Sequence, residues 1–278
     1  MRSIAILLSA VVAVGCSQQD RPTAGHEHGH AEVGTASHAH GEGGHAGHAA
    51  AKTKLDVRAD GEPEVGVPAT LRMSIQGKGG QPVKDFKEAH EAKVHLIIVR
   101  AGLDQFAHLH PEVNAESGEM TVGYTFPVGG TYHLFADFQE QGAAAGLAVG
   151  EFEVTGDAPA APALVPDAPG TVAGDGLTAQ ISVDGVKAGA EGTIRFVLST
   201  PDGKPASNLE PYMGAMGHLN IVSADATQFI HSHPSDGDGE KNKVTFIAHF
   251  HTGGLYKGWG QFKRNGRVQV VPFVLKVE

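Results

Sequence analysis

An internal duplication constrains the fold of this chain more than any other feature of its sequence. Residues 95–111 read HLIIVRAGLDQFAHLHP and residues 218–234 read HLNIVSADATQFIHSHP, and the two segments align without a gap. Downstream, Gly129–Gly130 matches Gly253–Gly254 after one extra residue in the second copy. A chain of 278 residues that repeats itself in this way is expected to form two domains of roughly 100 residues each.

Both copies are rich in strand signals. Short runs of alternating or β-branched apolar residues are separated by Gly- and Pro-rich turns, and only residues 84–93 could form a helical turn. This pattern predicts an all-β fold of two tandem immunoglobulin-like or cupredoxin-like β-sandwiches. The expected domains cover residues 55–156 and 173–278, and a Pro/Ala-rich linker joins them at residues 157–172. The main expected strands cover residues 69–75, 94–99, 119–126, 132–138 and 151–154, then 177–183, 192–198, 218–222, 243–249, 255–262 and 268–277.

The N-terminus carries a secretion signal. Residues 1–16, MRSIAILLSAVVAVGC, contain a basic residue, an apolar run and small residues, and the run is too short to span a membrane. Residues 13–16 resemble the lipobox of bacterial lipoproteins, which implies cleavage before Cys16 and lipidation of that residue. Ser17 then implies sorting to the periplasmic face of the outer membrane in a cell that has one. An ordinary secretory signal with an incidental cysteine is the alternative.

Cys16 is the only cysteine, and this limits the chemistry of the folded part. If Cys16 carries lipid, disulfides, Fe–S clusters, cysteine-containing zinc sites and blue copper are excluded. A metal ion must then be held by imidazole, thioether, carboxylate or backbone groups. The net charge of −10, with no basic stripe, argues against nucleic acid as a partner.

Residues 17–54 combine Gly, Ala, His and Glu with no aromatic residue, so we expect a disordered tether. Seven histidines lie in this segment, and neutral imidazole is a good ligand for Zn²⁺, Cu²⁺ and Ni²⁺. Their density favours metal capture over the alternative of a plain spacer between lipid and domains. The seven are His26, His28, His30, His38, His40, His45 and His48.

The second copy holds the richest set of metal ligands in the expected domains. Residues two apart in a strand share a face, so His231 can point the same way as His233, and His249 the same way as His251. The four imidazoles converge if the strand before Gly253 lies beside the H-x-H-P segment. Three further residues could complete this group: Met213, Met216 and His218. Thioether and imidazole without thiolate favour copper, and imidazoles alone would equally suit zinc.

The first copy offers a thinner set of five histidines: His90, His95, His108, His110 and His133. Of these, His95, His108 and His110 align with His218, His231 and His233. A site common to both copies could use only these three positions. The alternative is structural: Pro sets the backbone of a turn, and an imidazole bonds a backbone carbonyl. For the residues at the head of each segment, His95 and His218, the structural role is the favoured interpretation.

Three segments of the second copy carry a family resemblance. Residues 210–218, 229–234 and 254–262 read EPYMGAMGH, FIHSHP and GLYKGWGQF. They resemble poorly characterised bacterial secreted modules with the pattern E-P-Y-x-G-A-M-G-H, F-x-H-x-H-P and G-x-Y-x-x-W-G-Q-F. More distantly, the domains look like YtkA/FixH-type and copper-resistance immunoglobulin-like periplasmic domains. The resemblance implies a β-sandwich in a heavy-metal context, with copper as the first expectation.

The sequence therefore predicts an envelope lipoprotein that binds or buffers a transition metal, copper or alternatively zinc. No enzyme is expected, because phosphate-loop, G-x-S-x-G and H-E-x-x-H motifs are missing from the sequence. The alternative from another class is a structural or protein-interaction module whose histidine pairs stabilise turns. The expected partners are a metal ion and, through Cys16, a membrane. The sequence names no protein partner.

Overall fold

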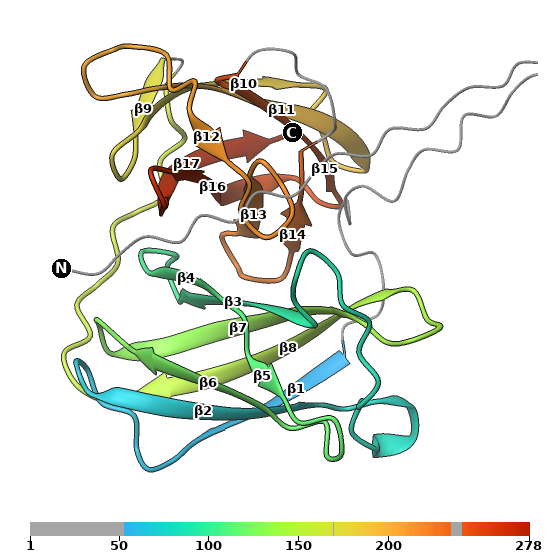
Figure 1. Cartoon of the computed structure of the whole chain (residues 1–278). Coiled ribbons are helices and arrows are strands. Elements are labelled where there is room, and N and C mark those ends of the chain that lie inside the picture. Colours follow the sequence, from blue (N-terminus) through green and yellow to red (C-terminus); the bar gives the residue numbers. More distant parts are fainter. Residues whose placement is uncertain (1–52, 169, 235–240) are drawn as a thin grey trace, which may run out of the picture. The chain divides into compact units, whose positions relative to one another are not determined.

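A computed structural model describes residues 53–168, 170–234 and 241–278, all of which belong to one compact unit (Figure 1). The expected signal peptide, Cys16 and nearly all of the expected tether lie outside these residues. The tether ends earlier than expected, because β1 (Thr53–Ala59) includes its last two residues. No helix among the described residues has the length and apolarity needed to cross a bilayer.

The first repeat is all-β. Its strands form one sheet in the order β4-β3-β7-β8-β1-β2-β6-β5. β1 changes partner along its length, pairing with β8 through Thr53–Lys54 and with β2 from Leu55 onward. The sheet thus forms two layers around a core that includes Leu71, Met120 and Leu134. The remaining strands are β2 (Pro68–Ile75), β3 (Val94–Arg100), β4 (Phe106–Leu109), β5 (Glu112–Val113), β6 (Met120–Thr125), β7 (Gly130–Gln139) and β8 (Ala145–Val154).

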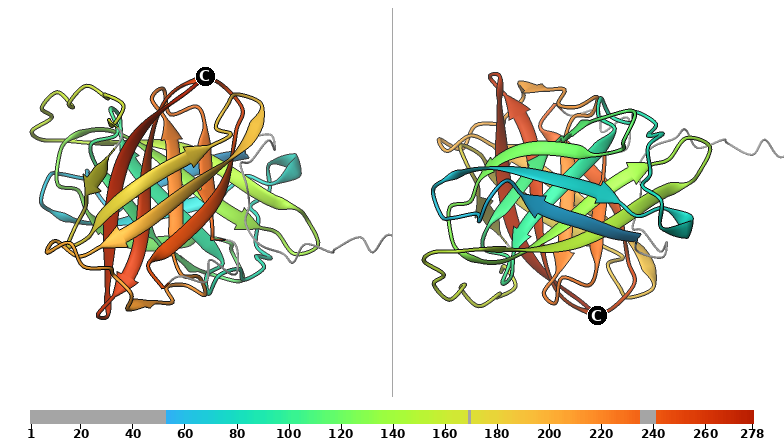
Figure 2. Two further views of the ribbon diagram at one scale, coloured as in Figure 1. Left: turned by 90° about the horizontal axis from the view of Figure 1, so that it is seen from above. Right: turned by 90° about the horizontal axis from the view of Figure 1, so that it is seen from below.

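The second repeat has two sheets. One has the order β15-β11-β10-β9, and the other has the order β12-β16-β13-β14 with β17 paired to β16. In Figure 2, the yellow and orange strands of the first of these sheets cross over the red strands of the other. The strands are β9 (Thr171–Ala173), β10 (Thr178–Asp184), β11 (Ala190–Ser199), β12 (Leu209–Glu210), β13 (His218–Ser223), β14 (Phe229–Ser232), β15 (Lys243–Phe250), β16 (Gly254–Arg264) and β17 (Arg267–Val277).

Side-chain alternation explains this two-layer packing. Ile194, Phe196 and Leu198 are buried in β11, whereas the residues between them are more exposed. Because successive side chains of a strand point to opposite faces, one face of β11 enters the core. The prediction of tandem β-sandwiches is confirmed. The helical turn considered for residues 84–93 does not form, and the only helical element in the described part is the 3-10 turn Lys78–Gly80.

Two hairpins break the alternation rule, and they position the site. The H-x-H-P segments, which the main expected strands do not include, run through the strands β4 and β14, which pair with β3 and β13. Every residue of β3, β13 and β14 is buried. A strand buried on both faces needs a packing partner on its second face, and here each hairpin supplies it for the other repeat.

An apolar cluster joins the hairpins of the two repeats. Phe106 of the first repeat stacks on Trp259 of the second, with ring centroids 4.6 Å apart and planes at 10°. Phe229 of the second repeat stacks on Phe135 of the first at 4.9 Å and 14°. These two contacts are equivalent under the duplication, so the repeats meet through matching surfaces related by a pseudo-two-fold axis.

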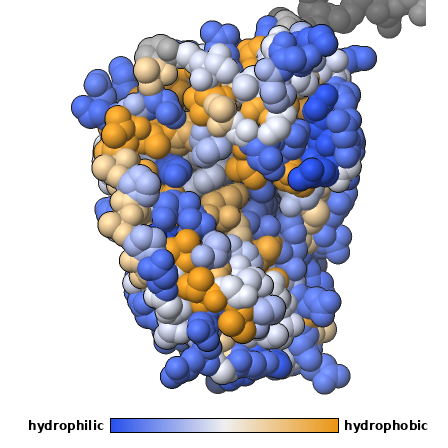
Figure 3. Space-filling model, turned by 90° about the vertical axis from the view of Figure 1, so that its left-hand side faces the viewer, coloured by the Kyte–Doolittle hydropathy of each residue, from blue (hydrophilic) through white to orange (hydrophobic). Residues whose placement is uncertain are grey.

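On the face drawn in Figure 3, hydrophobic side chains occur in small groups separated by hydrophilic ones. Larger apolar side chains are instead buried, either in the core of each repeat or in the cluster between them. The structure thus uses the second face of each hairpin to join the repeats.

Candidate metal centre

Seven imidazole rings gather where the two hairpins meet. Neighbouring rings lie between 3.6 and 6.5 Å apart, measured between centroids. Two overlapping trios have ligand atoms within 4.8 Å of one another: His95 with His108 and His110, and His95 with His218 and His231. These groups could hold a metal ion. The seven rings belong to His90, His95, His108, His110, His218, His231 and His233.

The duplicated strands place the head histidines in matching positions. His95 lies opposite Asp137 in the β3–β7 pair, and His218 lies opposite Gln261 in the β13–β16 pair. Residues directly opposite in antiparallel strands share a face of the sheet. Each head histidine therefore stands beside a polar residue of its own repeat, on the face that meets the other repeat.

A turn before each hairpin fixes the outer nitrogen of the head histidine. Nε2 of His95 lies 3.1 Å from the carbonyl oxygen of Ala89, and Nε2 of His218 lies 2.8 Å from that of Tyr212. A carbonyl only accepts, so Nε2 carries the proton and donates in both rings. In a neutral imidazole the other nitrogen, Nδ1, then has a free lone pair.

Two further hydrogen bonds cross between the repeats. Nδ1 of His108 donates to Oε1 of Gln261 at 2.7 Å, and Nδ1 of His231 donates to Oδ2 of Asp137 at 2.8 Å. Gln261 Oε1 also accepts from Nδ2 of Asn220 at 3.2 Å, which assigns it as the oxygen. With Nδ1 protonated, the lone pair of each ring lies on Nε2.

These four hydrogen bonds leave lone pairs that face each other. Nδ1 of His95 is 3.1 Å from Nε2 of His108, and Nδ1 of His218 is 3.4 Å from Nε2 of His231. When the four rings are neutral, neither contact has a proton to share, because each proton is then committed on the other side of its ring. A cation near both nitrogens would remove the repulsion. In a tetrahedral site with metal–nitrogen bonds of about 2.0–2.1 Å, two ligand nitrogens are about 3.3–3.4 Å apart.

Burial keeps five of the clustered rings uncharged near pH 7. Desolvation, reinforced by neighbouring histidines, lowers the pKa of His95 to about 3 and that of His218 to about 2. The same cause, desolvation first, lowers the pKa values of His108, His110 and His233. A neutral imidazole is the ligand form, so near pH 7 protons compete little with a metal ion for these nitrogens.

The outer histidines add nitrogens that the protein leaves unsatisfied. Both ring nitrogens of His233 and Nε2 of His110 are buried without a hydrogen-bond partner among the described residues. The ring of His90 stacks on that of His233 at 3.6 Å. Buried polar atoms are rarely left unpaired, so these atoms indicate a ligand at this place.

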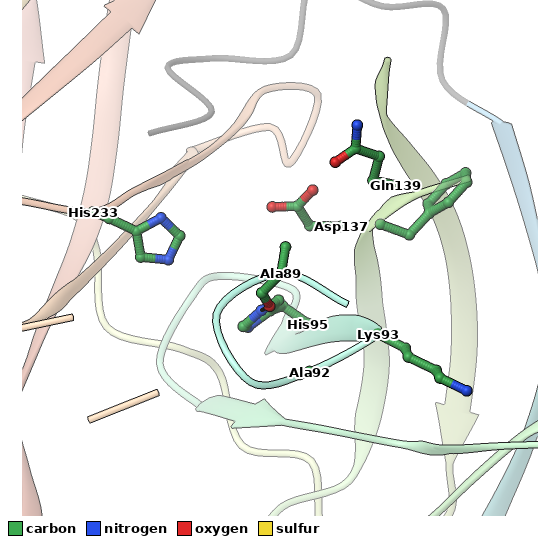
Figure 4. A pocket seen from close by; sticks show the side chains of 8 residues that line it. Ala89, Ala92, Lys93, His95, Asp137, Gln139 and His233 are labelled. Carbon is green, nitrogen blue, oxygen red and sulfur yellow. Dashed lines mark hydrogen bonds between the residues drawn. The ribbon is translucent and has the colours of Figure 1, made fainter. Parts of the chain in front are cut away.

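A small pocket reaches this centre beside the Ala89–Ala92 turn. It has a volume of ≈ 10 Å³, room for about one water molecule. His95, Asp137 and His233 line it, with Lys93 at its side. Figure 4 shows the Asp137 carboxylate and the His233 ring on opposite sides of this space. The pocket is therefore lined by residues of both repeats, beside two of the clustered histidines.

The structure does not gather all of the ligands expected from the sequence. His249 lies on β15 and His251 follows that strand, and neither belongs to the two trios found among the described residues. The four imidazoles of the second repeat thus do not form one group, although β15 lies beside the H-x-H-P segment, with Pro234 bridged to Phe246 and Oγ of Ser232 donating to the carbonyl oxygen of Ile247. Met216 is 41% exposed, and Met213 is partly buried in the turn that precedes His218. Neither methionine belongs to the clustered imidazoles.

Sequence reasoning missed two participants, Asp137 and Gln261. Asp137 is 3% exposed and Gln261 5%, and each holds a histidine of the opposite repeat. In the alignment Asp137 falls on Gln261, in the segments FADF and WGQF. A polar residue at the same place in two apolar strands was the available signal.

Comparisons with known proteins give a family and no function. A family model described as a domain of unknown function (DUF8832) matches residues 49–155 and again residues 171–278. No curated protein matches the sequence. A solved tetra-tandem repeat from the extending region of a large adhesion protein is similar, with 12% identity, a TM-score of 0.28, and coverage of 81% of this chain and 49% of that chain.

A second solved structure, trypsin-activated alpha-2-macroglobulin from Escherichia coli, has 9% identity, a TM-score of 0.25, and coverage of 81% of this chain and 15% of that chain. The chain thus spans about half of the first structure and a smaller part of the second. At these TM-scores, neither likeness carries a conclusion about this protein.

Proposed function

The chain belongs to the DUF8832 family of domains of unknown function, of which it holds two copies, and we propose that these copies bind one transition-metal ion between them. The ligands are Nδ1 of His95, Nδ1 of His218 and Nε2 of His231, with Nε2 of His108 beside them. The protein serves to bind or buffer this ion and not to catalyse a reaction.

This proposal rests on two pairs of ring nitrogens whose lone pairs face each other. A purely structural role explains why Nε2 of His95 and Nε2 of His218 bond backbone carbonyls. It does not explain why the opposite nitrogens meet other lone pairs at 3.1 and 3.4 Å. The hydrogen bonds to Asp137 and Gln261 have the form of outer-shell support, in which the far nitrogen of a metal-bound histidine donates to a fixed acceptor.

Charge balance favours one ion over two. With every ring in the neutral form that binds metal, the Asp137 carboxylate is the one charge of a site that is almost closed to water. One divalent ion leaves a net charge of +1, whereas two would leave +3 at high desolvation cost. The shared His95 has one free nitrogen and can serve one ion at a time.

The donor set favours zinc or copper. Imidazole is a borderline ligand that suits Zn²⁺ and Cu²⁺, whereas thioethers are the donors that favour Cu(I). Met216 is 41% exposed, so the thioether argument for Cu(I) rests on Met213 alone. The resemblance to copper-resistance domains favours copper. The near-tetrahedral spacing of the ring nitrogens favours zinc.

For the cellular role, we place the protein in the bacterial envelope, anchored through lipid on Cys16 at the periplasmic face of the outer membrane. The lipobox-like residues 13–16 support this placement. The histidine-rich residues 17–54 would capture ions at low affinity and raise their concentration near the folded centre.

Metal titration of residues 53–278 tests the proposal, since these residues contain every described strand and both cores. The protein is titrated with Zn(II), Cu(II) and Cu(I) against a competing chelator, beside His95→Ala and His218→Ala. Both variants should lose the tightest-bound ion, although they change different repeats. His133→Ala is the matched control and should keep the tightest-bound ion. This substitution alters a histidine of β7 that is paired with Glu151 of β8. Retention of that ion by both ligand variants would overturn the proposal.

A further inference from the structure

His249 and His251 form a second histidine pair that the metal centre does not use. His249 lies near the end of β15, which pairs with β11 in the four-stranded sheet, and His251 follows directly after the strand. Their rings are 4.5 Å apart with planes at 59°. Both side chains are partly buried. Two imidazoles so close can reach one ion.

Each ring has a nitrogen that the protein leaves unsatisfied. Nδ1 of His249 and Nε2 of His251 are buried and have no hydrogen-bond partner within the described part of the chain. Desolvation, with a smaller contribution from His249, lowers the pKa of His251, so that ring is neutral near pH 7. Buried nitrogens are rarely left without a partner, and a metal ion bound between the two rings would be a partner for both nitrogens.

A carboxylate lies on the same face. Glu191 of β11 is directly opposite His249 in the β11–β15 register, so their side chains project to the same side of the sheet. The side chain of Glu191 is exposed and can turn toward the pair. Two imidazoles and one carboxylate form a donor set for a divalent first-row ion and also contribute the negative charge that the first centre draws from Asp137.

We propose that His249 and His251, with Glu191, form a second binding site for a divalent transition-metal ion, separate from the centre between the repeats. It is specific to the second repeat, because Thr125 and Pro127 occupy the matching positions of the first. The site lies on the solvent side of one sheet and has fewer protein ligands. It therefore binds more weakly and exchanges its ion faster than the closed centre.

Copper(II) and zinc(II) titrations of residues 53–278 test this second site, with isothermal calorimetry for stoichiometry and electron paramagnetic resonance for the copper ligands. The double variant His249→Ala/His251→Ala should lose one weaker binding event and keep the tighter one. Glu191→Gln should weaken that same event by about tenfold, the lower range for loss of a group supporting a metal site. Ile247→Ala, an exposed change on the same strand, should alter neither event.

The proposals for the two sites can be refuted independently of each other. A double variant that binds the same ions as the unchanged protein overturns the second site, as does a titration with no weaker event at all. His95→Ala should remove only the tighter binding event, so it tests the centre between the repeats. The second site is tested by the double variant and by Glu191→Gln. Circular dichroism confirms that each variant retains its strands.

Discussion

Acidification of the metal-free protein tests whether the histidine centre is buried and neutral. The pKa of His95 is lowered to about 3 and that of His218 to about 2, whereas an unfolded histidine has a pKa of about 6.5. Below pH 6.5 the unfolded chain therefore binds protons that the folded chain refuses. The free energy of unfolding is highest above pH 6.5 and falls as the pH drops toward 3.

The size of the effect follows from these values. At pH 5, proton binding stabilises the unfolded state by about 2 kcal/mol for each such histidine. His95 and His218 together give about 4 kcal/mol, and His108 and His233, whose pKa values are lowered by the same burial, add to it. A loss of this size is comparable to the whole stability of many domains, about 5–15 kcal/mol.

Urea denaturation of residues 53–278 at pH 7 and pH 5, after removal of metal with a chelator, measures this loss. We expect the free energy of unfolding to fall by at least about 4 kcal/mol, and saturating metal at pH 7 to raise it. A change below about 1 kcal/mol between the two pH values would refute the reasoning, because the rings would then titrate as exposed groups do.

Four substitutions extend these expectations. Asp137→Asn should weaken metal binding by about 10–100-fold in a chelator competition. Gln261→Glu, at the matching position, should strengthen metal binding. Equal affinities of the two variants and the unchanged protein would show that neither acceptor supports a bound histidine. Trp259→Ala removes the ring stacked on Phe106 and should lower the free energy of unfolding by about 3–5 kcal/mol in urea, and an unchanged midpoint would contradict the packing between repeats. Gly258→Ala would bring Cβ to 2.3 Å from the Phe273 ring and should cost about 1–3 kcal/mol; an unchanged melting temperature would show that the ring moves freely.

The prediction of paired strands succeeded where one face is apolar and the other polar. β11 and β15 alternate in this way, and their expected ranges, 192–198 and 243–249, lie within the observed strands. It missed β4 and β14, which were not among the main expected strands. These segments carry histidines where an ordinary strand has an apolar side chain, because their second face lies against the other repeat.

The site was predicted in its residue types and not in its grouping. His95, His108, His110, His218, His231 and His233 were named from the duplication alone. Spacing along a strand shows which side chains share a face, and it does not show which strand of another sheet lies opposite. For that reason Asp137 was not named at all. His249 and His251 were expected to join His231 and His233, and the structure places them outside the two trios.

The sequence by itself determined the duplication, the all-β class and the histidines at matching positions, because these depend on local periodicity and on comparison of the chain with itself. Only the tertiary structure decided that the two repeats meet through their hairpins and bring histidines from both to one place. The contacts responsible, from His108 to Gln261 and from His231 to Asp137, join residues far apart in the chain. They arise from the packing of two doubly buried hairpins, which no local pattern in either copy specifies.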